Sequence, residues 1–154
     1  MERTHRIMFV CHGNICRSPM AEFLLKDMIK KEGLADRFVI ASAGTSREEI
    51  GNPVHQGTRK KLAQDHISAA GKYAVQLTKE DYKKYDLILG MDRANISNIL
   101  RIIGSDPQEK VHRLLDFTEL PRDIADPWYT GDFEITYAEI KAGCAALLKH
   151  LRRF

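Results

Sequence analysis

Ile7-Met8-Phe9-Val10-Cys11-His12-Gly13-Asn14-Ile15-Cys16-Arg17-Ser18-Pro19 stands near the start of the chain. Its first four residues form an apolar run without alternation, which is typical of a strand buried on both faces of a sheet. Ser18 followed by Pro19 is a helix-start signal, with the serine as N-cap and the proline in the first helical position. The stretch therefore predicts a buried strand, a short loop and a helix in immediate succession.

The rest of the chain repeats this alternation of strands and helices. Further strands are predicted at 38–41, 86–89 and, more weakly, 111–115. Further helices are predicted at 54–64, after 78–81, at 92–103 and along an apolar face from 137 to 151, with a long loop at 116–131. Such alternation implies right-handed crossovers and a parallel sheet covered by helices on both faces. We therefore expect a single three-layer α/β domain over residues 1–154, with any ligand beyond the carboxyl ends of the strands.

Composition narrows the class of protein. With 154 residues, of which 44% are hydrophobic, the chain can bury one sizeable core. It has no apolar run long enough to span a membrane, and the apolar stretch after the charged N-terminus is too short for a signal peptide. The three cysteines suit a reducing compartment, so we expect a cytoplasmic protein. The net charge is +3, and the basic residues do not gather into a stripe of the kind that binds nucleic acid. The six histidines do not have the spacing of metal ligands.

The loop between the first strand and the first helix has the composition of an anion-binding site. Its backbone N–H groups can surround one anion, and the N-terminus of the following helix adds a partial positive charge. Gly13 allows backbone angles that a side chain forbids, and Asn14 tolerates the left-handed region. Arg17 offers a planar fork to two phosphate oxygens. The predicted phosphate-binding residues are His12, acting as a spacer and not as a metal ligand, Gly13, Asn14, Ile15, Cys16, Arg17 and Ser18.

Cys11 stands at the entrance of this loop and faces the predicted anion site. The field that binds phosphate also stabilises a thiolate, which is the nucleophilic form of cysteine. Ser18 can donate a hydrogen bond toward the sulfur and so stabilise the thiolate as a leaving group. The competing interpretation is a cysteine buried in the core at the end of a strand, as is common for free cysteines. The neighbouring arginine, the glycine–asparagine pair and the serine–proline pair favour a catalytic cysteine.

Asp126-Pro127-Trp128-Tyr129 lies in the predicted long loop and suits a general acid. An aryl phosphate ester needs its leaving oxygen protonated, and a carboxylic acid can supply that proton and later accept one from water. Pro127 restricts the turn, and the two aromatic rings can pack against a phenol ring. The competing interpretation is an ordinary solvated aspartate in a turn. The rival acids by proximity, none of which precedes a proline and two aromatic residues, are Asp116, Asp123 and Asp132.

Cys11-His12-Gly13-Asn14-Ile15-Cys16-Arg17-Ser18-Pro19-Met20-Ala21-Glu22 resembles the signature of the low-molecular-weight protein tyrosine phosphatases. The resemblance continues, in order, through Ser42-Ala43-Gly44-Thr45, Thr78-Lys79-Glu80-Asp81, Met91-Asp92 and Asp126-Pro127-Trp128-Tyr129, and so covers nearly the whole chain. It implies a four-stranded parallel sheet flanked by helices, without metal or cofactor. It also implies hydrolysis of phosphotyrosine through a phospho-cysteine on Cys11, with Arg17 binding phosphate and Asp126 as general acid and base.

The resemblance assigns supporting roles as well. Asn14 and Ser42 hold the phosphate-binding loop by hydrogen bonds, whereas Ser42 taken alone is a plain loop hydroxyl. Cys16 forms a reversible disulfide with Cys11 that protects the nucleophile from overoxidation, against the alternative that Cys16 only packs beneath the loop. Two further residues have structural interpretations: Asp92 as the N-cap of a helix, and Cys144 as a core residue on the apolar face of the last helix.

Two positions depart from the family pattern. Where members often have an aromatic residue on the pocket rim, this chain has charged residues, including Glu48. We therefore expect a substrate pocket walled by Ile15, Glu48, Trp128 and Tyr129 that disfavours acidic peptides. Where many members have a histidine that supports the loop asparagine, this chain has Gly71, which leaves the stiffness of that support open.

Three alternative functions remain open. A protein-arginine phosphatase of the same fold carries threonine at the position of Ile15, whose apolar side chain suits an aryl ring better. An arsenate reductase needs further cysteines on a mobile segment, and residues 66–100 contain none. A non-catalytic phosphate-binding module would tolerate loss of Cys11 or Asp126, and both are present. The expected partner is a phosphotyrosine-containing protein or a small aryl phosphate, without nucleic acid or membrane, and we expect a monomer or weak dimer.

Overall fold

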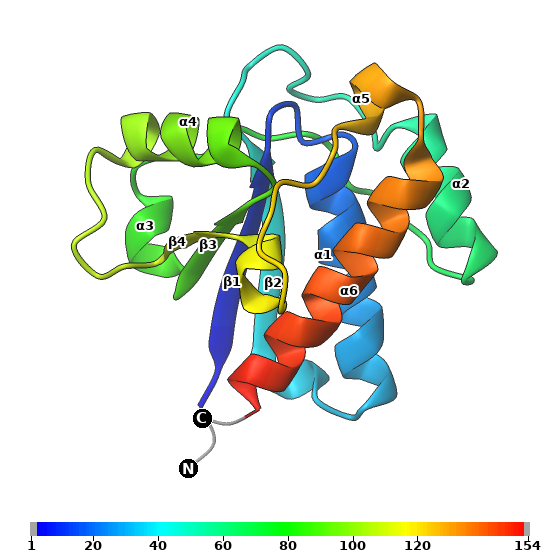
Figure 1. The fold of residues 1–154 in the computed structure, drawn as a ribbon, viewed down its shortest axis with the longest axis horizontal. Helices are drawn as coiled ribbons and strands as arrows, with labels where there is room; N and C mark the ends of the chain where they lie inside the picture. The colour runs from blue at the N-terminus through cyan, green and yellow to red at the C-terminus, as the bar shows by residue number, and fades with distance from the viewer. Residues whose placement is uncertain (1–2, 153–154) are drawn as a thin grey trace.

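A computed structural model describes residues 3–152 and shows a parallel sheet between two layers of helices (Figure 1). The strands are β1 (His5–Cys11), β2 (Phe38–Gly44), β3 (Leu87–Gly90) and β4 (Val111–Arg113), in the order β2-β1-β3-β4. Neighbouring strands pair in parallel. The predicted four-stranded α/β fold is confirmed. The predicted domain of residues 1–154 also includes residues 1–2 and 153–154, which lie outside the described residues.

Helices cover both faces of the sheet. One layer consists of α1 (Arg17–Lys31) and α6 (Phe133–Leu151), with α2 (Gln56–Gln64) beside them, and the other of α3 (Asp81–Lys84) and α4 (Arg93–Ile103) (Figure 1). The remaining elements are short: η1 (Ala35–Arg37), η2 (Leu114–Phe117) and α5 (Pro127–Thr130). The α5 helix and the start of α6 lie above α1, so residues from the end of the chain approach the loop after β1 (Figure 1).

The central strand β1 contributes to the core on both faces of the sheet, because successive side chains of a strand point to opposite faces. Ile7 and Phe9 pack in the cluster that includes α1 and α6, whereas Met8 and Val10 pack in the cluster that includes α4. All four side chains are buried, and each burial stabilises the fold by roughly 1.5–3 kcal/mol. The prediction of a strand buried on both faces is confirmed.

The start of the first helix differs from the prediction. Helix α1 begins at Arg17, and its N-cap is Cys16, which makes no side-chain capping bond. The predicted serine cap is therefore wrong, because the Ser18 hydroxyl lies 3.0 Å from the sulfur of Cys11 instead. The long loop predicted at 116–131 is also shorter than expected, since η2 and α5 occupy its two ends.

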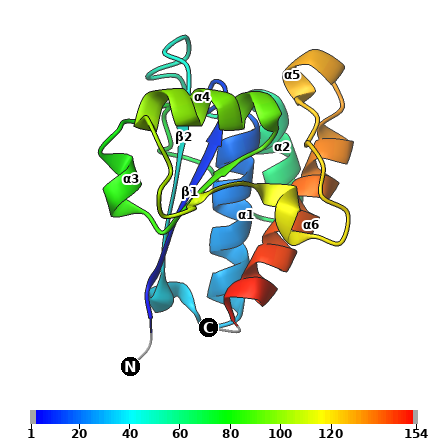
Figure 2. The same ribbon diagram turned by 60° about the vertical axis from the view of Figure 1, so that its left-hand side comes forward.

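The carboxyl ends of the strands meet at one edge of the sheet. Cys11 pairs with Gly44, Val10 with Gly90, and Gly90 with Arg113. Figure 2 shows α4 and α5 at this same end of the molecule. The loop after β1, the segment after β2 and the start of α4 are thus gathered where ligands bind in parallel α/β folds. Within residues 3–152, no helix combines the length and the apolar character that crossing a membrane requires.

Candidate active site

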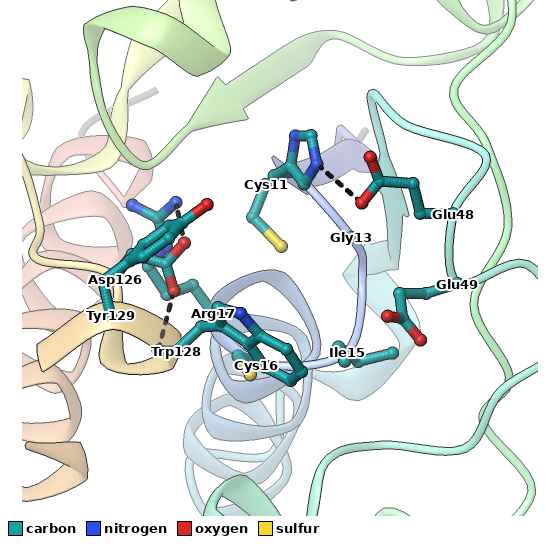
Figure 3. A pocket seen from close by; sticks show the side chains of 11 residues that line it. Cys11, Gly13, Ile15, Cys16, Arg17, Glu48, Glu49, Asp126, Trp128 and Tyr129 are labelled. Carbon is teal, nitrogen blue, oxygen red and sulfur yellow. Dashed lines mark hydrogen bonds and ion pairs between the residues drawn. The ribbon is translucent and has the colours of Figure 1, made fainter. Parts of the chain in front are cut away.

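A pocket opens at this edge, between the loop after β1 and the segment that carries α5 (Figure 3). Its lining residues are Cys11, His12, Gly13, Ile15, Cys16, Arg17, Glu48, Glu49, Asp126, Trp128 and Tyr129. The three residues predicted to be catalytic, Cys11, Arg17 and Asp126, are therefore brought together although the last lies far along the chain from the other two.

The loop after β1 turns its carbonyl groups away from the pocket. The carbonyls of Cys11 and His12 each accept a hydrogen bond of 2.9 Å from the backbone N–H groups of residues 45–46. The carbonyl of Ile15 accepts a hydrogen bond of 2.8 Å from the backbone N–H of His55. Because these carbonyls are held outside, the N–H groups of the loop are free to face an anion, as in other anion-binding nests.

Asn14 and Gly44 set the shape of the loop. Asn14 has a φ of 59°, the left-handed region predicted for it. Gly13 is not among the residues with a positive φ. The requirement for glycine falls on Gly44 of β2, where a Cβ atom would lie 2.7 Å from the carbonyl oxygen of His12. A side chain at position 44 would displace the loop from the strand.

The sulfur of Cys11 points into the pocket (Figure 3). It lies 3.3 Å from the backbone nitrogen of Asn14 and 3.0 Å from the Ser18 hydroxyl. The Ser18 oxygen accepts a hydrogen bond of 2.8 Å from the side-chain amide of Asn14, so its own proton can turn to the sulfur or to the Ala43 carbonyl at 3.3 Å. Two donors can thus converge on the sulfur of Cys11.

A chain of hydrogen bonds runs from Asn14 to a buried carboxylate. Asn14 Oδ1 accepts a bond of 3.0 Å from the backbone N–H of Val75, which fixes the orientation of the amide. Its Nδ2 donates to Ser42 Oγ at 3.0 Å, and Ser42 donates to Glu22 Oε1 at 2.5 Å. The Asn14 amide and the Ser42 hydroxyl are donors throughout this chain, so Ser18 accepts from Asn14 and its own proton is available to the Cys11 sulfur or to the Ala43 carbonyl. Sequence reasoning missed Glu22, which carries no signal beyond its place in the family motif.

Lys72 contacts this hydrogen-bond chain on the side away from the pocket. Its ammonium group donates to the Ser42 carbonyl at 2.8 Å and lies 3.9 Å from Glu22 Oε1. Burial lowers the pKa of Lys72, and the neighbouring Glu22 carboxylate partly opposes this effect. Lys72 therefore holds Ser42 and Glu22, while Asn14, which a histidine supports in many family members, accepts its bond from the Val75 N–H.

The guanidinium of Arg17 is buried at one side of the pocket. Nη1 donates to Asp92 Oδ2 and to the carbonyl of Ile124, both at 2.8 Å, and Nη2 lies 3.4 Å from Asp126 Oδ2. Asp92 also accepts a bond of 2.7 Å from the backbone N–H of Asn95, so its predicted role as a helix N-cap is confirmed. The ion pair with Arg17 was missed, although the place of Asp92 just beyond a strand end was a signal for it.

Asp126 reaches the pocket from the α5 side. Its Oδ1 accepts a bond of 3.0 Å from the backbone N–H of Trp128, which makes it the N-cap of α5. The rival aspartates are engaged elsewhere: Asp116 and Asp123 pair with Arg113, and Asp132 caps α6. Of the four candidate acids, Asp126 is the one that lines the pocket.

The pocket mouth has an aromatic side and an acidic side (Figure 3). Trp128 and Tyr129 are 57% and 82% exposed. On the opposite side, the Glu48 carboxylate lies 3.4 Å from the ring of His12, which therefore does more than fill the loop as a spacer. Glu49 lines the same side. The sequence prediction named Glu48 as part of the rim but did not include Glu49.

Cys16 lies in the pocket floor and is buried. Burial raises the pKa of the Cys16 thiol to about 12, and the negative charges of Cys11 and Asp126 add to this effect. Cys16 is therefore a protonated thiol at neutral pH. All three cysteines are free, and Cys144 packs in the core as predicted. In residues 3–152, no cluster of histidine, cysteine and acidic side chains is suited to hold a metal ion.

The fold and the pocket define an α/β protein with a cysteine in the loop that follows its first strand. The family model for the low molecular weight phosphotyrosine protein phosphatases matches residues 6–154. The chain belongs to this family, as the resemblance predicted, and is a protein-tyrosine-phosphatase.

Individual relatives agree with this assignment. The low molecular weight protein-tyrosine-phosphatase YfkJ of Bacillus subtilis is 40% identical over 149 residues, which are 96% of each chain. PtpA of Staphylococcus epidermidis is 35% identical, over 94% of this chain and 92% of its own. Among solved structures, YfkJ has a TM-score of 0.94 over 97% of this chain and 96% of its own, at 39% identity. A protein tyrosine phosphatase from Entamoeba histolytica, with Hepes in the active site, has a TM-score of 0.89 at 27% identity, over 97% and 98% of the two chains.

Proposed function

We propose that this chain hydrolyses phosphotyrosine and related aryl phosphate monoesters through a covalent phospho-cysteine on Cys11. The observation that carries the proposal is the convergence of the Cys11 sulfur, the Arg17 guanidinium and the Asp126 carboxyl group on one pocket. A nucleophile, a bidentate anion-binding group and an acid are the groups that this reaction requires.

In the first step the Cys11 thiolate attacks phosphorus and forms the S–P bond. Arg17 and the inward N–H groups of the loop bind the equatorial oxygens, where negative charge is concentrated in the transition state. Asp126 gives its proton to the aryl oxygen as the P–O bond breaks. Its capping bond from the Trp128 N–H, made through Oδ1, leaves Oδ2 on the side of Arg17.

In the second step water attacks the phospho-cysteine and passes a proton to the Asp126 carboxylate. The S–P bond breaks, inorganic phosphate leaves and the Cys11 thiolate returns. A thiolate is a better leaving group when a hydrogen bond stabilises its charge, and the Ser18 hydroxyl at 3.0 Å supplies one. The chain through Asn14, Ser42 and Glu22 makes the Ser18 oxygen an acceptor from Asn14, which leaves the Ser18 proton available to the sulfur.

The pocket lining favours an aryl substrate. Ile15 presents an apolar side chain, and the exposed rings of Trp128 and Tyr129 can pack against a phenol ring. In a protein-arginine phosphatase, the main alternative, a polar residue would stand at the position of Ile15 and would bind the attacking water. The substrate is accordingly a phosphotyrosine-containing protein or a small aryl phosphate. A mechanism that needs free thiols favours a reducing compartment such as the cytoplasm.

The test is hydrolysis of p-nitrophenyl phosphate by the wild type, Cys11→Ser and Asp126→Ala. Cys11→Ser removes the nucleophile and is expected to abolish turnover. Asp126→Ala removes the acid and base and is expected to lower kcat by about 10²–10⁴-fold, chiefly through loss of the base that activates water in the second step. Asp123→Ala is the matched control, since that carboxylate pairs with Arg113 outside the pocket, and it should retain wild-type turnover.

Turnover that survives in Cys11→Ser would exclude a phospho-cysteine. A wild type that binds phosphate but hydrolyses no ester would indicate a binding module. Parallel assays with phosphotyrosine and phosphoarginine peptides test the substrate, and faster turnover of phosphoarginine would overturn the aryl assignment.

A further inference from the structure

His55 contacts both halves of the pocket. Its backbone N–H donates to the carbonyl of Ile15, in the phosphate-binding loop, at 2.8 Å. Its ring stacks on Phe133 at the start of α6, with centroids 5.3 Å apart and planes 10° apart. The same ring meets Trp128 of α5 edge to face, with centroids 5.7 Å apart and planes 76° apart. One residue thus joins the loop that holds the nucleophile to the segment that holds the acid.

The ring of His55 is held in one orientation. Its Nδ1 accepts a bond of 3.0 Å from the backbone N–H of Gly57, which makes His55 the N-cap of α2. Gly57 also lets the Phe133 ring approach, because a Cβ atom there would lie 2.4 Å from that ring. A capping bond on one edge and a stacked ring on one face leave the imidazole little freedom to rotate.

The position of Trp128 affects the position of the Asp126 carboxyl group. The backbone N–H of Trp128 donates to Asp126 Oδ1 at 3.0 Å, so a movement of Trp128 would move the carboxyl group. On the other side of Asp126 the chain is held by backbone bonds: Ile124 N–H donates to the Met91 carbonyl at 2.9 Å, and the Ala125 carbonyl accepts from Thr136 at 2.9 Å. After Asp126 in the chain, Trp128 is 57% exposed, and its ring packs edge to face against His55.

We infer that His55 is a positioning residue for the general acid, which it holds by packing its ring against Trp128. This inference rests on the proposed phosphatase mechanism. His55 does not line the pocket and acts through Trp128 and the capping bond to Asp126. Small displacements of a catalytic group cost large factors in rate, so loss of this ring contact should weaken proton transfer to the leaving group.

Two substitutions separate the ring from the cap. His55→Asn keeps a side-chain acceptor for the Gly57 N–H but removes the ring, whereas His55→Phe keeps a ring and removes the acceptor. We expect His55→Asn to lower kcat/KM for phenyl phosphate about tenfold, as for a displaced general acid. The loss for p-nitrophenyl phosphate should be much smaller, because the weakly basic nitrophenolate leaves with little need for a proton. His55→Phe should keep the wild-type ratio between the two esters.

The intrinsic fluorescence of the protein provides a second measurement, since Trp128 is its single tryptophan. His55→Asn should shift the emission to longer wavelength as the indole gains contact with water, and His55→Phe should not. His66→Asn is the control, because His66 is exposed past the end of α2 and its φ of 62° suits asparagine. It should match the wild type in both assays.

Equal losses for the two esters in His55→Asn, or an unchanged emission, would overturn the inference. So would a ratio in His55→Phe that changes as much as in His55→Asn, because the cap would then be the cause. A wild type that hydrolyses neither ester would contradict the proposed function instead. The emission spectra would then still decide whether the ring of His55 holds Trp128.

Discussion

The hydroxyl group of Ser18 has two competing uses. In an isolated strand–loop–helix segment, serine before proline is a strong N-cap, and its oxygen would accept a bond from the helix backbone. In the folded chain the Asn14 amide donates to that oxygen at 2.8 Å, and the sulfur of Cys11 lies 3.0 Å away. The tertiary contacts prevail, and Cys16 becomes an N-cap without a side-chain bond. The helix-capping preference of Ser18 is therefore overridden by its contacts with Asn14 and with the sulfur of Cys11.

The burial of Cys16 leads to a prediction about how the protein responds to peroxide. Because burial keeps its pKa near 12, Cys16 is a poor target for peroxide, and the thiolate of Cys11 reacts first to give a sulfenic acid. The Cys16 thiol then attacks that sulfur, a disulfide forms and water leaves. A thiol reductant should therefore restore most of the activity of peroxide-treated wild type but little of that of Cys16→Ser, in which Cys11 proceeds to the sulfinic acid.

The readouts are residual turnover after reduction and the intact mass of the oxidised protein. Wild type should lose two hydrogens, and Cys16→Ser should gain two oxygens. Cys144→Ala is the control, since Cys144 lies in the core and leaves the pair in the loop intact. If Cys16→Ser recovers as fully as wild type, Cys16 only packs beneath the loop.

At the scale of secondary-structure elements, Asp92 joins the start of α4 to the buried Arg17. One oxygen caps the helix and the other pairs with the guanidinium at 2.8 Å. Asp92→Asn retains the cap but loses the charge, and because the carboxylate is partly exposed we expect a cost of about 1–3 kcal/mol in the free energy of unfolding. Asp92→Ala should cost about 1 kcal/mol more, the usual value of a cap.

Urea unfolding measures these differences, and Asp132 provides the matched pair. Its carboxylate caps α6 through the backbone N–H of Ile135 at 3.0 Å. Asp132→Asn should therefore be nearly neutral, while Asp132→Ala should cost about 1 kcal/mol. If Asp92→Asn were as stable as wild type, the ion pair with Arg17 would contribute nothing measurable to the fold.

The elements also explain what the sequence can predict. The loop after β1 is contiguous in the sequence, so Cys11 and Arg17 could be identified as candidate site residues from their spacing, and β1 was predicted because residues 7–10 form an unbroken apolar run. Glu22 and His55 could not be assigned, because their contacts with Ser42 and Trp128 depend on how distant elements pack. The start of α1 was misplaced for a related reason, since the capping preference of Ser18 yields to its contacts with Asn14 and Cys11.

In the molecule as a whole, the pocket depends on most of the fold. The loop after β1 is held by residues 45–46 after β2 and by His55 before α2. The guanidinium of Arg17 is held by Asp92 at the start of α4 and by the carbonyl of Ile124 before α5. The termini of the strands and helices thus converge on the pocket, and each of these contacts joins it to a different element. Binding at the site should therefore stabilise the entire structure.

Phosphate, the product of the proposed reaction, tests this coupling. At 100 times its dissociation constant a ligand of the folded state adds about 2.7 kcal/mol of stability, which for a chain of this size corresponds to a rise in Tm of about 5–10 °C. Cys11→Ser keeps the loop and Arg17, so it should show a similar rise, whereas Arg17→Lys loses the bidentate fork and should show a smaller one. Sodium chloride at equal ionic strength is the control in a thermal unfolding assay. If phosphate at concentrations that inhibit turnover left the wild-type Tm unchanged, inhibition would not arise from binding at this site.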